Sequence, residues 1–180
     1  MALGEIMNGS VNPSGRLPDT WAADFSKDPT FINFGTGSTP EGSDKYDGGM
    51  YYFVDYEEGV YVGYRYYETR GLYEGEDWYA QNVVYPFGYG LSYTTFEYSD
   101  LVVEEAAEEG EEYGYDVTFT VTNTGDVTGS ETAQVYLGEV EVPENIMIAK
   151  YQLAGFTKVK DLEPGESRTV TVHIDQRSLS

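Results

Sequence analysis

Three carboxylates lie close together within a segment rich in aromatic residues: Asp55, Glu57 and Glu58. In an extended strand, Asp55 and Glu57 would share one face and lie ~6–7 Å apart along it. Paired carboxylates can cleave a glycosidic bond, and this spacing is closer to an inverting pair than to a retaining pair of ~5 Å. The simpler interpretation, which we favour, is the polar edge of a strand beside a turn at Glu57-Glu58-Gly59.

Four further side chains are candidates for contact with a substrate: Arg16, Trp21, Arg65 and Trp78. An arginine beside aromatic rings can hold a sugar hydroxyl or a carboxylate, and an indole ring can stack on a sugar face. Each has a structural alternative. Arg16 would form an ion pair that fixes its loop, and Arg65 would pair with an acid and stack on tyrosine. Most of the 18 tyrosines follow strand alternation, which predicts core or sheet surface.

Metal and cofactor chemistry have little support. The chain has no cysteine and a single histidine, His173, which falls on the polar side of Val172 and Ile174. The six glutamates between Glu104 and Glu112 form a block rather than a calcium loop, and they predict a solvated hairpin connection. We therefore expect no metal site, no cofactor and no catalytic residue among the motifs found.

Charge limits the partners. The formal net charge is −22, from 32 acidic and 10 basic residues, and such a surface repels nucleic acids and anionic membranes. No apolar run approaches the ~20 residues of a membrane helix. The absence of cysteine fits a cytoplasmic protein and does not exclude a secreted one.

Two kinds of segment follow one another along the chain. Residues 2–7 predict a helix that ends at Asn8-Gly9, residues 10–50 and 70–82 predict loops, and Tyr51–Tyr67 predicts a strand. Alternation of period two then predicts five strands, with turns at Asn123–Asp126 and Leu162–Glu166 between some of them. The expected strands are Thr94–Val103, Tyr115–Asn123, Ser130–Leu137, Tyr151–Val159 and Arg168–Ile174.

These features predict a mainly β fold, an immunoglobulin-like or fibronectin type III-like β-sandwich, preceded by the loop-rich tail of an α/β sandwich domain. An immunoglobulin-like sandwich needs about seven strands, so we expect this one to lack its last strands. The predicted domains are 1–91 and 92–180. The packed segment Val83–Leu101, with Pro86, Gly88 and Gly90, would join them.

Several phrases of the chain resemble glycoside hydrolase family 3, the β-glucosidase family, and occur in that family's order. They are VNPSGRLPDTW, EEGVYVGYRYYET, YPFGYGLSYTTFEYSDL, VTNTGDVTGSETAQVYL and LAGFTKVKDLEPGESRTVTV. DTWAADFSKDPTFINFG resembles the subgroup whose sandwich and fibronectin-like domains precede the catalytic barrel. The position of the barrel, before or after this segment, is left open.

The resemblance implies a fragment of a retaining β-glycosidase that acts on a β-glucoside or a related oligosaccharide. The family's nucleophile is an aspartate on the barrel, and its acid/base is commonly a glutamate upstream of the segment that matches VNPSGRLP. Neither motif is found here, so the resemblance implies structural support and an active-site loop, without catalysis by this segment alone. The alternative is a stand-alone carbohydrate-binding or protein-interaction module.

Overall fold

The computed structural model describes residues 2–33, 58–110, 112–138 and 148–179. The chain divides into two compact units, each assembled from separated stretches of sequence. The first comprises Met1–Arg16, Tyr89–Leu137 and Gln152–Ser180, and the second comprises Leu17–Gly88 and Gly138–Tyr151. Each unit is described by itself, and the predicted domain boundaries at 91 and 92 remain a prediction.

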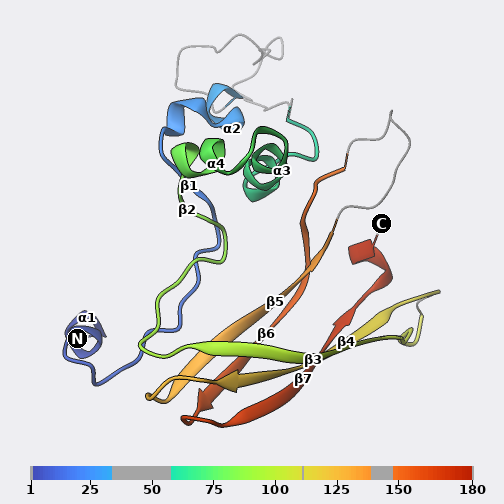
Figure 1. Ribbon diagram of the computed structural model, residues 1–180. Coiled ribbons are helices and arrows are strands. Elements are labelled where there is room, and N and C mark those ends of the chain that lie inside the picture. Colours follow the sequence, from blue (N-terminus) through green and yellow to red (C-terminus); the bar gives the residue numbers. More distant parts are fainter. Residues whose placement is uncertain (1, 34–57, 111, 139–147, 180) are drawn as a thin grey trace, which may run out of the picture. The chain divides into compact units, whose positions relative to one another are not determined.

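The first unit contains a sandwich of two antiparallel sheets (Figure 1). One sheet has the order β3-β4-β7, formed by β3 (Phe96–Glu105), β4 (Tyr115–Asn123) and β7 (Ser167–Ile174). The other pairs β5 (Gly129–Leu137) with β6 (Gln152–Leu162). The same unit holds α1 (Ala2–Met7) and the short 3-10 helix η2 (Gln176–Leu179). The prediction of a mainly β sandwich, and of the helix that ends before Asn8-Gly9, is confirmed.

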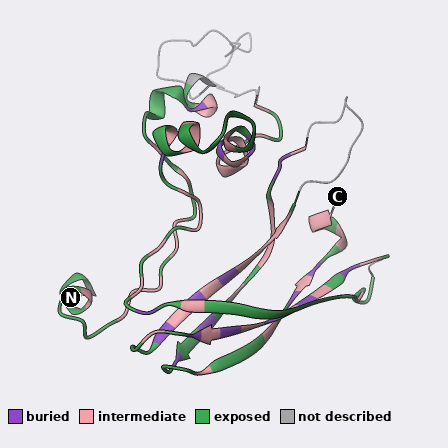
Figure 2. Ribbon diagram, viewed as in Figure 1, coloured by how far each residue is buried: buried purple, intermediate pink, exposed green. Residues whose placement is uncertain are grey.

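The core of the sandwich follows the alternation of the strands, and Figure 2 shows the buried positions along them. Along β4 every second residue is buried, including Val117, Phe119 and Val121. Their partners across the sheet in β7 include Val172, which lies opposite Val117. The second sheet contributes Ala133, Val159 and Leu162 to the same cluster. Alternating apolar residues therefore build one core from both inner faces, as period two requires.

The outer face of the β4–β7 pair is polar. Opposed hydroxyls form a ladder there: Thr118 with Thr171 at 2.8 Å, Thr120 with Thr169 at 3.1 Å, and Thr122 with Ser167 at 2.8 Å. The ring nitrogen Nδ1 of His173 lies 2.8 Å from Oδ1 of Asp116, its direct partner across the strands. The predicted polar position of His173 is thus filled by a cross-strand pair at the sheet surface.

The turn after β4 is organised by the fully buried side chain of Asn123. Its Nδ2 donates to the carbonyls of Val127 and Leu162, each at 2.9 Å. Its Oδ1 accepts from the backbone N–H of Gly125 at 3.1 Å and from the hydroxyl of Thr94. One side chain therefore joins the start of β3, the β4–β5 turn and the end of β6.

The second unit is mostly helical and irregular. It contains β1 (Trp21–Ala22), the 3-10 helix η1 (Phe25–Lys27), α2 (Pro29–Asn33), α3 (Tyr64–Glu74), α4 (Glu76–Asn82) and β2 (Val83–Tyr85). β1 and β2 form a small antiparallel pair. The predicted loop over residues 10–50 contains these short elements up to residue 33, and the rest of it lies outside the described residues. Within the described ranges, no helix has both the length and the apolar character needed to span a membrane.

Two sequence predictions in this unit are wrong. The strand expected over Tyr51–Tyr67 is contradicted by α3, which begins at Tyr64, while residues 51–57 lie outside the described part. The loop expected over residues 70–82 is instead the end of α3 followed by α4. Tyrosine favours strands only weakly, and tertiary contacts of Tyr66 and Tyr67 with Trp78 override that preference.

Glycines explain why this region resembled a loop. Gly75 has φ of 95° and joins α3 to α4, ending the first helix while its C=O begins the second. A residue with positive φ is usually a turn signal, and here it separates two helices rather than two loops. Glu76 and Asp77 follow in the first turn of α4, where acidic side chains favour the helix dipole.

Candidate functional site

A buried ion pair holds the segment before residue 17 against the sandwich. Nη2 of Arg16 donates to Oε2 of Glu131 on β5, and the two side chains are only 16% and 10% exposed. The hydroxyl of Tyr98 on β3 donates to Oε1 of the same glutamate at 3.1 Å. Burial, reinforced by the charge of Glu131, raises the pKa of Tyr98 above its usual range. These contacts match the loop-fixing alternative that the sequence left open for Arg16.

The backbone lies equally close to this pair. A Cβ added at Gly90 would come within 2.2 Å of the carbonyl oxygen of Gly15 and 2.9 Å of Cδ of Arg16. Nζ of Lys158 donates to the carbonyl and the hydroxyl of Ser14 at 2.7 and 2.8 Å. The segment around Arg16 is therefore fixed by charge, hydrogen bonds and close packing at once.

A small cavity of about 220 Å³ lies on the helical unit. Aromatic, charged and amide side chains line it: Asp24, Lys27, Tyr66, Tyr67, Arg70, Trp78 and Asn82. This composition suits a hydroxyl-rich ligand such as a sugar, because indole and phenol rings stack on apolar ring faces while polar groups bind hydroxyls. Trp78 is the sequence candidate that the fold brings to this cavity.

Arg70 is packed among the aromatic residues of the cavity. Its guanidinium carbon lies 4.8 Å from the ring centroid of Trp78 and 5.7 Å from that of Tyr66. It also donates to the hydroxyl of Tyr66, and its Nε lies 3.6 Å from Oε1 of Glu74. The hydrogen bond to Tyr66, more than the nearby charges, raises the pKa of Arg70 further, so the group stays cationic. Cation–π and ion-pair contacts thus already engage this arginine.

The other polar groups of the cavity are engaged as well. The hydroxyl of Tyr67 donates to Oδ2 of Asp28 at 2.8 Å, and burial followed by this bond raises the pKa of Tyr67. Asp24 accepts from the backbone N–H and the hydroxyl of Ser26, and its Oδ2 lies 3.5 Å from Nζ of Lys27. The hydroxyl bond from Ser26 is the main reason that the pKa of Asp24 is lowered. The network can hold η1, α3 and α4 together without any ligand.

The remaining candidates lie elsewhere. Trp21 is exposed on β1 and packs edge-on against Tyr85 of β2, with ring centroids 5.8 Å apart. Arg65 lies in the first turn of α3 and is half-buried. Asp55 and Glu57 lie outside the described residues, and Glu58 lies in a turn before α3. The substrate-binding roles of Arg16, Trp21, Arg65 and Trp78 stay predictions.

Sequence reasoning missed Tyr66 and Arg70, which line the cavity from α3. Tyr66, Arg70 and Glu74 are spaced four residues apart, which is the signature of one face of a helix. Helical periodicity in this segment would have found them. Among the described residues, no cluster of three or more His, Cys, Asp or Glu side chains is placed to hold a metal ion.

The comparisons with known proteins agree with the fold. A family model described as a fibronectin type III-like domain matches residues 131–180. Thermostable β-glucosidase B of Acetivibrio thermocellus is 36% identical over 179 residues, which cover 99% of this chain and 20% of that protein. The solved structure of β-glucosidase 3B from Thermotoga neapolitana, in complex with α-D-glucose, aligns with a TM-score of 0.74 at 38% identity, over 99% of this chain and 21% of that one.

The chain matches the C-terminal part of glycoside hydrolase family 3 enzymes. The family 3 relatives are not all β-glucosidases: an exo-α-(1->6)-L-arabinopyranosidase of Bifidobacterium longum is 39% identical over 181 residues, covering 99% of this chain and 20% of that protein. The chain spans about a fifth of the length of these family 3 relatives. The resemblance expected from the sequence phrases is therefore confirmed.

Proposed function

We propose that this chain is part of a retaining β-glycosidase that hydrolyses a β-glucoside or a related oligosaccharide, and that its role there is structural. The observation that carries the proposal is identity of 36–39% to family 3 glycosidases over nearly the whole chain, which spans only about a fifth of their length. The activity would then belong to a longer polypeptide that includes a catalytic barrel.

The chemistry supports this division of labour. A retaining glycosidase needs two carboxyl groups ~5 Å apart, one as nucleophile and one as acid/base. The described acids of the candidate site already have structural tasks: Glu131 pairs with Arg16, Asp28 accepts from Tyr67, and Asp24 caps η1. A carboxylate held in such bonds is poorly available to attack a sugar. We therefore propose that both catalytic carboxylates are supplied by other parts of the longer enzyme.

The Arg16 ion pair and the Arg70–Trp78 cluster would act as supports within that enzyme. Their side chains point into their own unit and are saturated by neighbours, which favours fixing a loop over binding a substrate. Trp21 is the candidate with the most exposed ring, so it is the one best placed for contact with an oligosaccharide. Even there, Tyr85 covers one side of the indole.

The purified 180-residue chain is expected to show no hydrolysis of an aryl β-glucoside. Without a positioned acid/base and nucleophile it lacks the main sources of acceleration, since acid–base assistance alone contributes roughly 10²–10⁴-fold. Release of the aryl alcohol, followed by absorbance over hours, checks this.

The positive control is the full-length T. neapolitana β-glucosidase 3B at the same molar concentration. Turnover by the chain that survives repurification would contradict the proposal if it also disappears in Asp55→Asn or Glu57→Gln. Turnover that persists unchanged in both variants and declines with purification would indicate a contaminating enzyme.

A further inference from the structure

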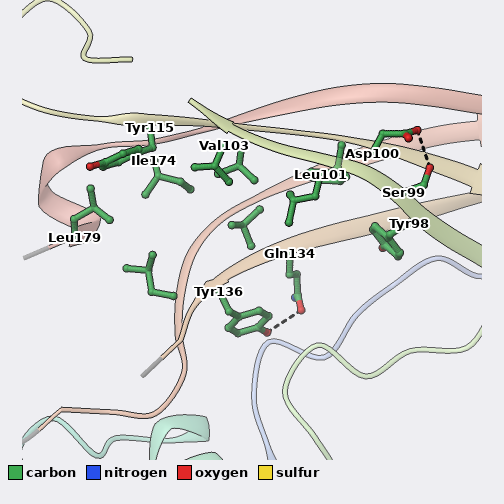
Figure 3. A pocket seen from close by; sticks show the side chains of 14 residues that line it. Tyr98, Ser99, Asp100, Leu101, Val103, Tyr115, Gln134, Tyr136, Ile174 and Leu179 are labelled. Atoms are coloured by element: carbon green, nitrogen blue, oxygen red, sulfur yellow. Dashed lines mark hydrogen bonds between the residues drawn. The ribbon is translucent and has the colours of Figure 1, made fainter. Parts of the chain in front are cut away.

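An open apolar groove runs along one side of the sandwich (Figure 3). Its volume is about 730 Å³, far more than the voids left inside packed cores. Its floor is the inner face of β4, with Tyr115, Val117 and Phe119 at alternate positions. Leu179 of η2 and Ile174 of β7 close one end. The groove is thus an uncovered part of the core between the two sheets.

The two walls of the groove are strand edges. Four consecutive residues of β5, Gln134–Leu137, line one wall. A strand that presented only a face would contribute every second residue, so consecutive residues mean that the edge of β5 borders the groove. β5 pairs with β6 on its other side and, among the described residues, with no strand on this one. Its backbone groups along the groove are therefore open to a further strand.

The opposite wall is β3, whose inward side chains lack cover. The register places Val103 opposite the buried Val117 of β4, so Val103 faces the interior. Nevertheless Val103 is 58% exposed and its neighbour in the groove, Leu101, is 68% exposed. Apolar residues on the inner face of a sandwich are normally covered by the facing sheet. Here the facing sheet does not reach them.

The unequal width of the sheets explains the gap. The first sheet has three strands and the second has two among the described residues. β6 packs against β7, at the far side from β3. A third strand added to the open edge of β5 would lie ~4.8 Å from it and would come to cover the inner face of β3. One strand therefore satisfies both an open edge and an uncovered face.

We propose that the groove binds one extended strand of polypeptide from outside these 180 residues, paired to the open edge of β5. The strand would carry an apolar side chain at every second position, directed onto Leu101 and Val103. Its intervening residues would be polar or basic, because β3 carries Glu97, Asp100, Glu104 and Glu105 and the chain has a net charge of −22. This inference concerns the sandwich alone and does not depend on the proposed glycosidase activity.

The chain provides a matched pair of variants for the test. Val102 and Val103 are adjacent on β3 and similarly exposed, at 48% and 58%. Val102 lies opposite Thr118, whose hydroxyl belongs to the outer ladder, so Val102 faces away from the groove. Val103→Asp and Val102→Asp thus add the same charge at the same strand, but only the first places it in the groove.

The probe is a synthetic peptide of nine residues, the length of β5, with valine at every second position and threonine and lysine between. A control peptide has the same composition with its valines consecutive. Binding is followed by fluorescence anisotropy, and hydrogen exchange follows the amides of β5. The alternating peptide should bind one to one and slow exchange along β5. Val103→Asp should weaken binding about tenfold or more, since it buries a carboxylate, while Val102→Asp stays within about twofold.

Circular dichroism and cooperative urea unfolding show that each variant is folded. If Val103→Asp fails this check, Leu101→Asn replaces it, because Leu101 is the more exposed residue of the pair. Absence of binding, equal binding of both peptides, or an equal effect of the two aspartates would overturn the proposal. So would a dimer in sedimentation that dissociates on Val103→Asp, because a second copy would then occupy the groove.

Discussion

Replacing Arg16 by methionine is expected to lower the free energy of unfolding by about 3 kcal/mol, because Glu131 then keeps a buried charge without its partner. Glu131 is only 10% exposed, and the hydroxyl of Tyr98 is its other hydrogen-bond donor. Methionine keeps most of the volume of the arginine side chain, so the change removes charge rather than packing. Urea unfolding at neutral pH, followed by circular dichroism, measures the effect.

The double variant Arg16→Met, Glu131→Met should recover much of this loss, since both buried charges disappear together. Arg168→Met is the matched control: Arg168 pairs with Glu166 at 2.6 Å, but the two side chains are 43% and 36% exposed. Exposed pairs contribute about 0–1 kcal/mol. Equal losses at Arg16 and Arg168 would show that burial does not govern the first pair.

Asn123→Ala is expected to destabilise the sandwich by about 3 kcal/mol, because two buried carbonyls lose a donor and the N–H of Gly125 loses an acceptor. The carbonyls belong to Val127 and Leu162, and Leu162 is fully buried, so water is poorly placed to replace the amide. The same urea titration checks this, provided that the dependence on denaturant remains that of a two-state transition.

Thr120→Ala is the control for Asn123. It also removes a side-chain hydrogen bond from β4, to Thr169 at 3.1 Å, but on the exposed ladder where water can take the place of the lost partner. A change within about 0.5 kcal/mol is expected there. A loss at Asn123 no larger than at Thr120 would mean that the turn repacks without the amide.

The sandwich could be predicted because its strands carry their own signal. In Tyr115–Asn123 the apolar side chains alternate with threonines, so a single segment shows both the strand and its buried face. α3 shows no such signal. Its sequence, YRYYETRGLYE, has aromatic residues on several sides, and only Tyr67 and Thr69 are buried. The helix is stabilised by contacts with residues that follow in α4, which no local pattern reveals.

The candidate site could be predicted only in part. Trp78 was identified as a candidate from its residue type, but the cavity that contains it also depends on Asp24 and Lys27 of another segment. The partner of Arg16 is Glu131, which is 115 positions away in the chain. Sequence shows that such an arginine needs an acid, and only the fold shows which of the 32 acids lies within reach.

The way in which the two units share the chain has a consequence for synthesis on the ribosome. The chain passes from one unit to the other after Arg16, Gly88, Leu137 and Tyr151. The last stretch of the first unit, Gln152–Ser180, contains β6 and β7. β5 therefore emerges before its only described partner, and the inner face of β4 waits for both late strands. Neither unit can mature while the other is still to come, so a pause in translation anywhere before β7 would leave the core residues Val117, Phe119 and Val121 open to chaperones.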